Sequence, residues 1–192
     1  CPELRAACTD RDGKIYSLPK KLPLRPTVCG NGLYINQDWL DNLGLEAPKT
    51  LDELTDVLLA FAKEDADGDG DPTNEIGLWG CMVSRNNNYM GLNNDGEAVF
   101  VPAQENYKEA VEWMHMLWEN GVLDPEYFTQ DGSSVTAKLQ AEGGSKVGII
   151  SAWTADSEAG TNAKQYSLME AVEGYNDIHY VECATASLDI TD

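Results

Sequence analysis

The segment Asp65–Glu75, with the sequence DADGDGDPTNE, places five carboxylates within eleven residues and contains no basic residue. Like charges at this density repel one another, so the segment can fold compactly only if something neutralises it. An amphipathic run precedes it, and the apolar run 76–79 follows it at once. The fold of this chain therefore has to hold a strongly anionic loop between two ordered elements.

The spacing of these acids matches the first half of an EF-hand calcium loop. Asp65, Asp67 and Asp69 occupy loop positions one, three and five. Gly70 falls at position six, where the loop bends sharply, and Asp71 can offer its backbone carbonyl from position seven. Carboxylates at alternate positions of a tight loop can turn inward around one hard cation. This half of the loop predicts a bound calcium ion.

The second half of the loop departs from the EF-hand pattern. Position twelve, which carries a bidentate Glu in an EF-hand, is Ile76 here, and Glu75 stands one place earlier. We expect Glu75 to close the site, Asn74 to add an oxygen, and a strand to leave the loop. The predicted Ca2+ ligands are Asp65, Asp67, Asp69, Asp71, Asn74 and Glu75. The alternative is a solvated turn whose Asp side chains only cap local backbone amides.

Helical and strand patterns alternate along the chain, which predicts an α/β fold. The clearest helix begins after Thr50, an N-cap with Glu53 three residues later, and apolar residues follow at helical spacing. A calcium ion in the loop after it would be structural and would pin this helix to the next strand. Further helices are predicted near residues 39–40 and at 106–120, 134–142 and 163–172. Strands are predicted at 15–18, 33–36, 75–79, 97–101, 146–150 and 179–184.

Charge and composition narrow the possible partners. The 192 residues include 13 Lys plus Arg against 33 Asp plus Glu, a formal net charge of −20, which argues against nucleic acid and anionic membranes. Five scattered cysteines lack CxxC spacing, and His115 and His179 stand alone, so neither a zinc site nor a catalytic triad is indicated. No apolar run reaches the length of a membrane span.

Four sequence blocks occur in a recognisable order: DGKIYSLP, LYINQDWLDNLGLEAPKTLDEL, DADGDGDPTNEIGL and KVGIISAW. Together they resemble the extracellular solute-binding proteins of bacterial ABC importers for carbohydrates. The resemblance is to the large lipoprotein group whose members carry a calcium loop. It extends from about Asp10 to Ala184, and the second block and the loop are its most specific parts.

The resemblance implies one lobe of a type II periplasmic-binding-protein-like fold, with a sheet flanked by helices. In that family the same blocks lie well inside a longer, two-lobed protein. Residues 1–192 are therefore expected to be a central fragment, a single lobe that is mostly the second one. The implied role is non-catalytic capture of an oligosaccharide outside the cell for the permease subunits of an ABC importer. The full-length protein would be a cell-surface lipoprotein, held to the membrane only by a lipid anchor absent from this fragment.

Aromatic and amide side chains are the candidates for sugar binding, because sugars stack on rings and bond their hydroxyls to planar polar groups. Trp153 follows directly on an apolar strand, at the carboxyl end where open α/β sheets place ligands. A core or surface Trp is the alternative. The other candidates are Tyr34, in the strand 33–36, and Arg85, Asn87 and Tyr89, in the amide-rich loop SRNNNYMGLNN. Strand aromatics are more often core, and Asn clusters more often form turns.

Two other functions stay open on sequence grounds. A carbohydrate-active enzyme domain would need two carboxyl groups about 5 to 9.5 Å apart in a cleft, and with so many acids no pair is informative without geometry. A calcium-stabilised adhesion module would bind a protein or surface without a cleft. The sequence contains neither a phosphate-binding Gly-rich loop nor a nucleophile elbow. We therefore expect a binding protein and no enzyme.

Overall fold

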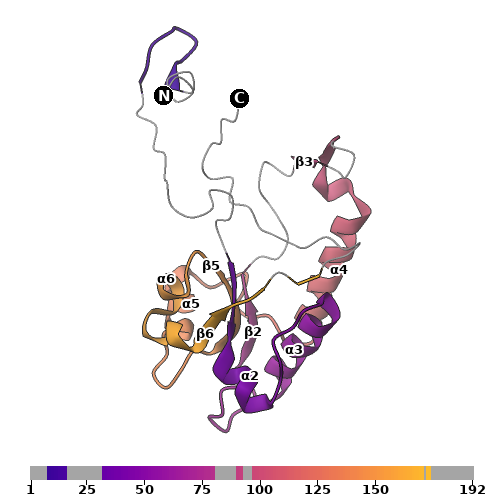
Figure 1. Cartoon of the computed structure of the whole chain (residues 1–192), viewed down its shortest axis with the longest axis vertical. Coiled ribbons are helices and arrows are strands. Elements are labelled where there is room, and N and C mark those ends of the chain that lie inside the picture. Colours follow the sequence, from indigo (N-terminus) through magenta and orange to yellow (C-terminus); the bar gives the residue numbers. More distant parts are fainter. Residues whose placement is uncertain (1–7, 17–31, 81–89, 93–96, 171, 174–192) are drawn as a thin grey trace.

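A mixed sheet forms the centre of the molecule (Figure 1). The computed structural model describes residues 8–16, 32–80, 90–92, 97–170 and 172–173. Strand order is β2-β5-β1-β6, with β2 parallel to β5 and β1 antiparallel to both of its neighbours. The bounds are β1 Gly32–Asn36, β2 Ile76–Trp79, β5 Val147–Ala152 and β6 Tyr166–Leu168, and a separate hairpin joins β3 Met90–Leu92 to β4 Ala98–Phe100.

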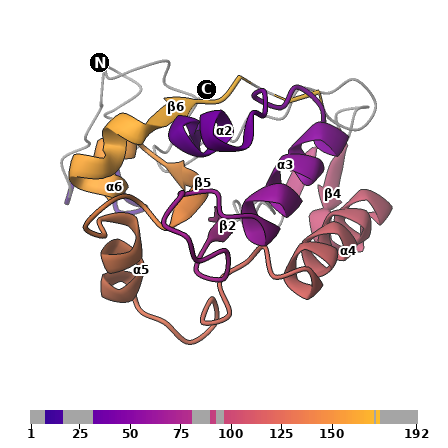
Figure 2. The same cartoon turned by 90° about the horizontal axis from the view of Figure 1, so that it is seen from below.

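Helices cover both faces of this sheet (Figure 2). Their bounds are α2 Gln37–Leu43, α3 Leu51–Lys63, α4 Glu105–Glu119, α5 Gly132–Leu139 and α6 Ala155–Ala159, with short 3-10 turns η2 Val101–Ala103 and η3 Gly160–Gln165. In Figure 2, α3 and α4 lie on one side of the sheet, and α5 and α6 lie on the other. The expected sheet flanked by helices is confirmed.

Two hydrophobic clusters fill the space between these layers, because successive strand residues point to opposite faces. Ile149 of β5 packs in the cluster on the α3 face with Phe61. Its neighbour Ile150 packs on the other face with Leu139 of α5. The buried strand predicted at residues 146–150 is thus confirmed, and it extends to Ala152.

Helix α3 is anchored as its sequence predicts. Thr50 accepts a hydrogen bond from the backbone N–H of Glu53 (3.2 Å), and the Glu53 carboxylate accepts one from the N–H of Thr50 (3.3 Å). The helix buries Leu54, Val57, Leu58 and Phe61. Phe61 lies over Gly148, where a Cβ would come 2.3 Å from the ring, so α3 packs directly onto the β5 backbone.

The predicted helix at residues 163–172 is wrong. The chain forms the 3-10 turn η3 and then β6, in which Tyr166 pairs with Asn36 of β1. The Tyr166 hydroxyl donates to the carbonyl of Val147 and shares a hydrogen bond with the Ser145 hydroxyl. These contacts come from distant parts of the chain and override the weak local helical pattern.

Helix α4 is confirmed, but its expected buried face is not. The apolar residues at helical spacing predict a buried stripe of Tyr107, Ala110, Val111, Met114, Leu117 and Trp118. Only Leu117 is buried, and Val111 and Trp118 are 45% and 37% exposed. The helix contacts the rest of the fold through α3, where Trp113 Nε1 donates to Thr55 Oγ1 (2.9 Å). An outer helix of this kind needs only a narrow apolar stripe.

One further predicted helix is present with a different start, and two predicted strands lie wholly or partly outside the described residues. The helix predicted at 134–142 begins earlier, at Gly132, because Asp131 caps it through the N–H of Ser134 (2.9 Å). Of the strand predicted at 15–18, Ile15 forms a single bridge with Thr9, Tyr16 is exposed and in no strand, and residues 17–18 lie outside the described residues. The strand predicted at 179–184 also lies outside them.

Candidate metal centre

The acidic loop lies where several elements meet at one end of the sheet. It joins the end of α3 to β2, and its Ala66 carbonyl accepts a hydrogen bond from Asn42 Nδ2 (3.1 Å) just before the end of α2. The carbonyl of Lys146, at the start of β5, accepts from the N–H of Ile76 (2.9 Å). The loop is therefore fixed at the amino ends of the parallel strands β2 and β5.

Each of the first three acids binds the loop backbone with one oxygen. Asp65 Oδ2 accepts from the N–H of Gly70 (3.0 Å), Asp67 Oδ1 from that of Asp69 (3.0 Å), and Asp69 Oδ1 from that of Asp71 (2.8 Å). The capping role weighed as the alternative to metal binding is thus present. It uses only half of each carboxylate and leaves the second oxygen for another partner.

The three carboxylates come together. Asp65, Asp67 and Asp69 each offer an oxygen, and these oxygens lie within 4.8 Å of one another. Asp71 turns its Oδ1 to the N–H and hydroxyl of Thr73 (3.2 and 2.6 Å), and the hydrogen bonds from Thr73 lower the pKa of that carboxyl. The role predicted for Asp71, through its backbone carbonyl, does not need the side chain and stays a prediction.

Three oxygens of the predicted ligand set are buried and, among the described residues, accept no hydrogen bond: Asp65 Oδ1, Asn74 Oδ1 and Glu75 Oε2. Glu75 is only 7% exposed, and its other oxygen accepts from the N–H of Ala66 (3.1 Å). Burial raises the pKa of the Glu75 carboxyl. Leaving such oxygens dry and unpaired costs free energy, and calcium prefers an all-oxygen site, so these residues fit a calcium ion.

Lys146 is a participant that the sequence reasoning missed. Its ammonium donates to Oδ2 of both Asp67 and Asp69. The Lys146 bond, with help from Asn74, lowers the pKa of Asp69 to about 2. Burial alone would lower the pKa of Lys146, but its bonds to the two carboxylates outweigh this and raise it. Lys146 is 77 residues away from Asp69, and no local pattern links them.

Two of the ligand candidates, Trp153 and Tyr34, lie near the opposite end of β5. Trp153 directly follows this strand and is 44% exposed. Tyr34 is 8% exposed, its ring packs in the core beside Ile150, and its hydroxyl donates to the Trp153 carbonyl (3.3 Å). This hydrogen bond ties the backbone at Trp153 to the buried residue Tyr34. Arg85, Asn87 and Tyr89 lie outside the described residues.

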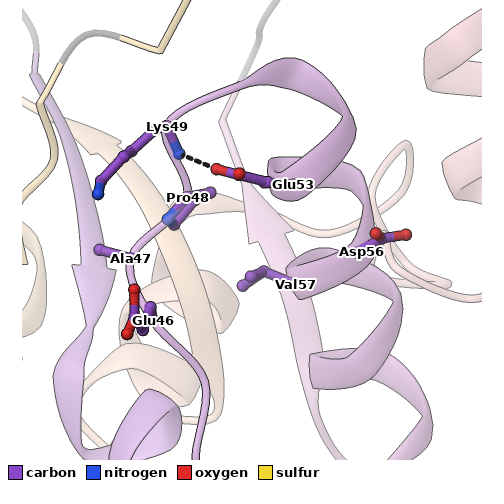
Figure 3. A pocket seen from close by; sticks show the side chains of 7 residues that line it. All are labelled: Glu46, Ala47, Pro48, Lys49, Glu53, Asp56 and Val57. Atoms are coloured by element: carbon purple, nitrogen blue, oxygen red, sulfur yellow. Dashed lines mark hydrogen bonds between the residues drawn. The ribbon is translucent and has the colours of Figure 1, made fainter.

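Two hollows border these elements. A cavity of about 370 Å3 adjoins the acidic loop, and Asp67 forms part of its wall. Another, of about 220 Å3, lies at the opposite end of α3 beside the capping box, where the N–H of Lys49 donates to Glu53 (Figure 3). Of the predicted site residues that the structure describes, none lines this second hollow. In the described part of the chain, no helix has the length and apolar character needed to cross a membrane.

Comparison with known proteins identifies relatives over most of the chain. The fructooligosaccharide ABC transporter substrate-binding protein FusA of Streptococcus pneumoniae is 32% identical, over 90% of this chain and 35% of its own length. The polygalacturonan/rhamnogalacturonan-binding protein YtcQ of Bacillus subtilis is 34% identical over 68% of this chain and 26% of its own length. Lipoprotein LipO of the same organism is 25% identical over 87% and 34%.

Solved structures agree with these relatives. FusA in complex with kestose superposes with a TM-score of 0.80 and 31% identity, over 96% of this chain and 40% of FusA. A FusA variant called an EF-hand mutant, in complex with fructo-nystose, gives the same TM-score at 30% identity. No protein-family model matches the sequence.

This chain spans about a third of the length of the curated relatives FusA and LipO, and a quarter of YtcQ. Across that span both sequence and fold agree with binding proteins of sugar transporters. The chain is therefore a homologue, over most of its length, of the sugar-binding proteins of bacterial ABC transporters, and it has their type II solute-binding fold.

Proposed function

We propose that this chain forms one lobe, mostly the second, of a two-lobed extracellular protein that captures an oligosaccharide for an ABC importer without catalysis. FusA and YtcQ support the ligand class, and the coverage of a third of FusA supports the single lobe. LipO supports attachment of the whole protein at the cell surface by a lipid anchor. The permease subunits of the importer are the proposed protein partners.

We further propose that calcium stabilises this lobe through the acidic loop. The observation that carries the proposal is the set of three buried oxygens, on Asp65, Asn74 and Glu75, that have no donor in the part of the chain that the structure describes. Asp67 and Asp69 would add one oxygen each, and the Asp71 carbonyl a sixth, which reaches the lower limit of calcium coordination. The FusA variant called an EF-hand mutant supports a loop of this kind in that relative.

The ion would stabilise the fold of the lobe and would not contact the sugar. When bound, it would supply positive charge to the loop and join the end of α3 to the start of β2. Lys146 and Trp153 flank the six residues of β5, and the two positions are therefore roughly 20 Å apart along the strand. The ring of Trp153 is exposed there, and we propose that it stacks on the C–H face of a sugar unit.

Thermal unfolding tests the calcium proposal directly. The chain should melt at a temperature that rises steadily with calcium concentration above the dissociation constant, and a chelator should reverse the rise. Magnesium should stabilise less at equal concentration, because it demands a smaller octahedral site and gives up its water reluctantly. Melting temperatures that do not change between chelator and millimolar calcium would overturn this proposal.

Binding of a sugar by a single lobe is expected to be weak, because half of the contacts are missing. Indole N–H resonances in 1H–15N spectra detect such weak binding, and kestose and a rhamnogalacturonan oligosaccharide are suitable probes. The Trp153 resonance should shift with one of these sugars, whereas that of the fully buried Trp39 should not. If millimolar concentrations of both sugars leave every Trp resonance unchanged, the proposed role of Trp153 is wrong.

A further inference from the structure

We propose that Lys146 is a built-in competitor for the calcium site: its ammonium holds the acidic loop together without metal and must withdraw when calcium binds. This proposal rests on the calcium function proposed above. It assigns to Lys146 the role of setting the calcium affinity of the loop. The role is distinct from that of the six predicted ligands, which donate oxygens.

The ammonium occupies oxygens that a metal would need. Asp67 and Asp69 each commit Oδ1 to a backbone N–H of the loop, so Oδ2 is the oxygen that each can turn to a cation. Asp69 Oδ2 also accepts from Asn74 Nδ2 (3.1 Å). Lys146 Nζ donates to both of these Oδ2 atoms. Calcium and the ammonium therefore compete for the same two atoms.

The ammonium is an incomplete substitute for calcium. It carries one charge beside five carboxylates in the segment Asp65–Glu75, and it bonds only two of them. The buried oxygens on Asp65, Asn74 and Glu75 still have no donor among the described residues. Since a calcium ion takes six to eight oxygens, it could contact these three together with the two that Lys146 holds.

The position of Lys146 makes the competition effective. The Lys146 side chain is 25% exposed. Lys146 directly precedes β5, and the first residue of that strand, Val147, is buried. The backbone carbonyl of Lys146 is held by the N–H of Ile76, directly after the loop. The ammonium is therefore tethered at the site at a high effective concentration, as a second ligand on a short linker would be.

Replacing Lys146 by a neutral residue should have two opposite effects, one on the stability of the metal-free chain and one on its affinity for calcium. Without metal, the loop loses its tethered cation and the chain should become less stable. When calcium binds to such a variant, it does not have to displace an ammonium group and no positive charge repels it. The affinity for calcium should therefore increase. A purely structural lysine would show only the first effect.

The test compares Lys146→Met, which keeps the aliphatic stem, with the wild-type chain and with Lys164→Met, an exposed lysine on η3. Calorimetric titration with calcium gives the dissociation constant, and melting in chelator gives the metal-free stability. Lys146→Met should lower the dissociation constant about tenfold, the scale of a lost hydrogen bond to a charged group. It should also melt at a lower temperature in chelator, whereas Lys164→Met should match the wild type in both measurements.

The possible results separate this proposal from the calcium function. If both chains bind calcium and Lys146→Met binds with unchanged or weaker affinity, the proposal for Lys146 is wrong and the calcium function stands. If only Lys146→Met binds calcium, Lys146 blocks the site and the calcium function of the wild-type chain is wrong. If neither chain binds, both proposals are wrong. Lys146→Gln provides the same comparison if Lys146→Met does not fold.

Discussion

The two oxygens of one carboxylate have separate roles in the acidic loop. Asp67 and Asp69 shape the loop with Oδ1 and face a cation with Oδ2. Glu75 follows the same division, because one oxygen accepts from Ala66 and the other has no donor in the described part of the chain. The backbone bonds of the loop therefore fix its shape without metal, and the proposed ion would displace Lys146 without rebuilding the loop backbone.

Glu75→Gln tests this division at a single residue. The amide can keep the bond to Ala66, but it removes the buried negative charge that a calcium ion would neutralise. We expect the metal-free melting temperature to be unchanged or higher and the stabilisation by calcium to fall by most of its value. Glu64→Gln, at the exposed end of α3, is the matched control and should keep the full calcium response. A full calcium response in Glu75→Gln would show that this carboxylate is no ligand.

The residue types of the loop could be predicted from sequence, but its electrostatic surroundings could not. Spacing by two residues with Gly70 at the bend is a local pattern, and it identified the three carboxylates that cluster. Lys146 reaches the loop only because β5 runs beside β2, which is a property of the sheet. The sequence around the loop contains no signal that predicts this pairing of strands.

At the scale of elements, the contact between α3 and β5 determines how closely the helix layer approaches the sheet. Phe61 fills the space above Gly148, and a Cβ on Gly148 would lie 2.3 Å from the ring and 3.0 Å from the Gly77 carbonyl oxygen. The ring of Phe61 is also held edge-on by Trp39, at a centroid distance of 5.2 Å. The helix cannot move outward without breaking this core.

Gly148→Ala should therefore be strongly destabilising. Overpacking in a close-packed core typically costs 1 to 3 kcal/mol, and with backbone on one side we expect a loss of about 3 kcal/mol. Gly132→Ala, at the first residue of α5, is the control, because a Cβ there meets open space. Denaturant unfolding of the two variants measures the difference. Equal stabilities would mean that α3 does not pack against β5 at this distance.

A second contact between elements ties the turn before α5 to the helix itself. Asp124 is 2% exposed and its Oδ2 accepts from Lys138 Nζ (2.7 Å) and Gln130 Nε2 (2.8 Å). Burial alone would raise the pKa of Asp124, but its hydrogen bonds, chiefly from Lys138, outweigh this and lower it. The ionised pair therefore favours the folded state above the ordinary Asp pKa.

Lys138→Met should destabilise the chain by about 3 kcal/mol at pH 7, because it leaves a buried carboxylate without its cation. The loss should shrink as the pH falls below about 4, since Asp124 is then protonated in the unfolded chain and the pair contributes less. Denaturant unfolding of wild type and variant across this pH range gives the comparison. A difference that stays constant with pH would contradict the role of the Asp124 charge.

Strong local patterns predicted elements well, and weak ones did not. Helix α3 has a capping box and a regular apolar face, and both are present as expected. At residues 163–172 the local helical spacing is overridden, because their structure depends on Tyr166 reaching Ser145 and on the pairing of β6 with β1. The last strand of a sheet is defined by its partner, and the partner here is more than a hundred residues earlier in the chain.

For the molecule as a whole, the two ends of β5 have different chemistry. The acidic loop and Lys146 are at its start, and the exposed Trp153 follows its end. The net charge of −20 attracts cations to the entire surface, but such attraction is screened by salt and is not specific. Specific stabilisation by a metal therefore has to come from the loop, at the far end from the aromatic ring.

This separation predicts that metal and sugar responses can be removed independently. Trp153→Ala should abolish the sugar-induced shifts of the backbone amide resonances next to residue 153 and leave the calcium-dependent rise in melting temperature intact. Glu75→Gln should lose most of the calcium-dependent rise in melting temperature and keep the sugar-induced shifts, measured at temperatures where this variant remains folded. Both follow from the roughly 20 Å between the two sites along β5. If a chelator removed the sugar response of the still-folded wild-type chain, the loop would have to act on the Trp153 end through the sheet, and the independence argued from this geometry would be wrong.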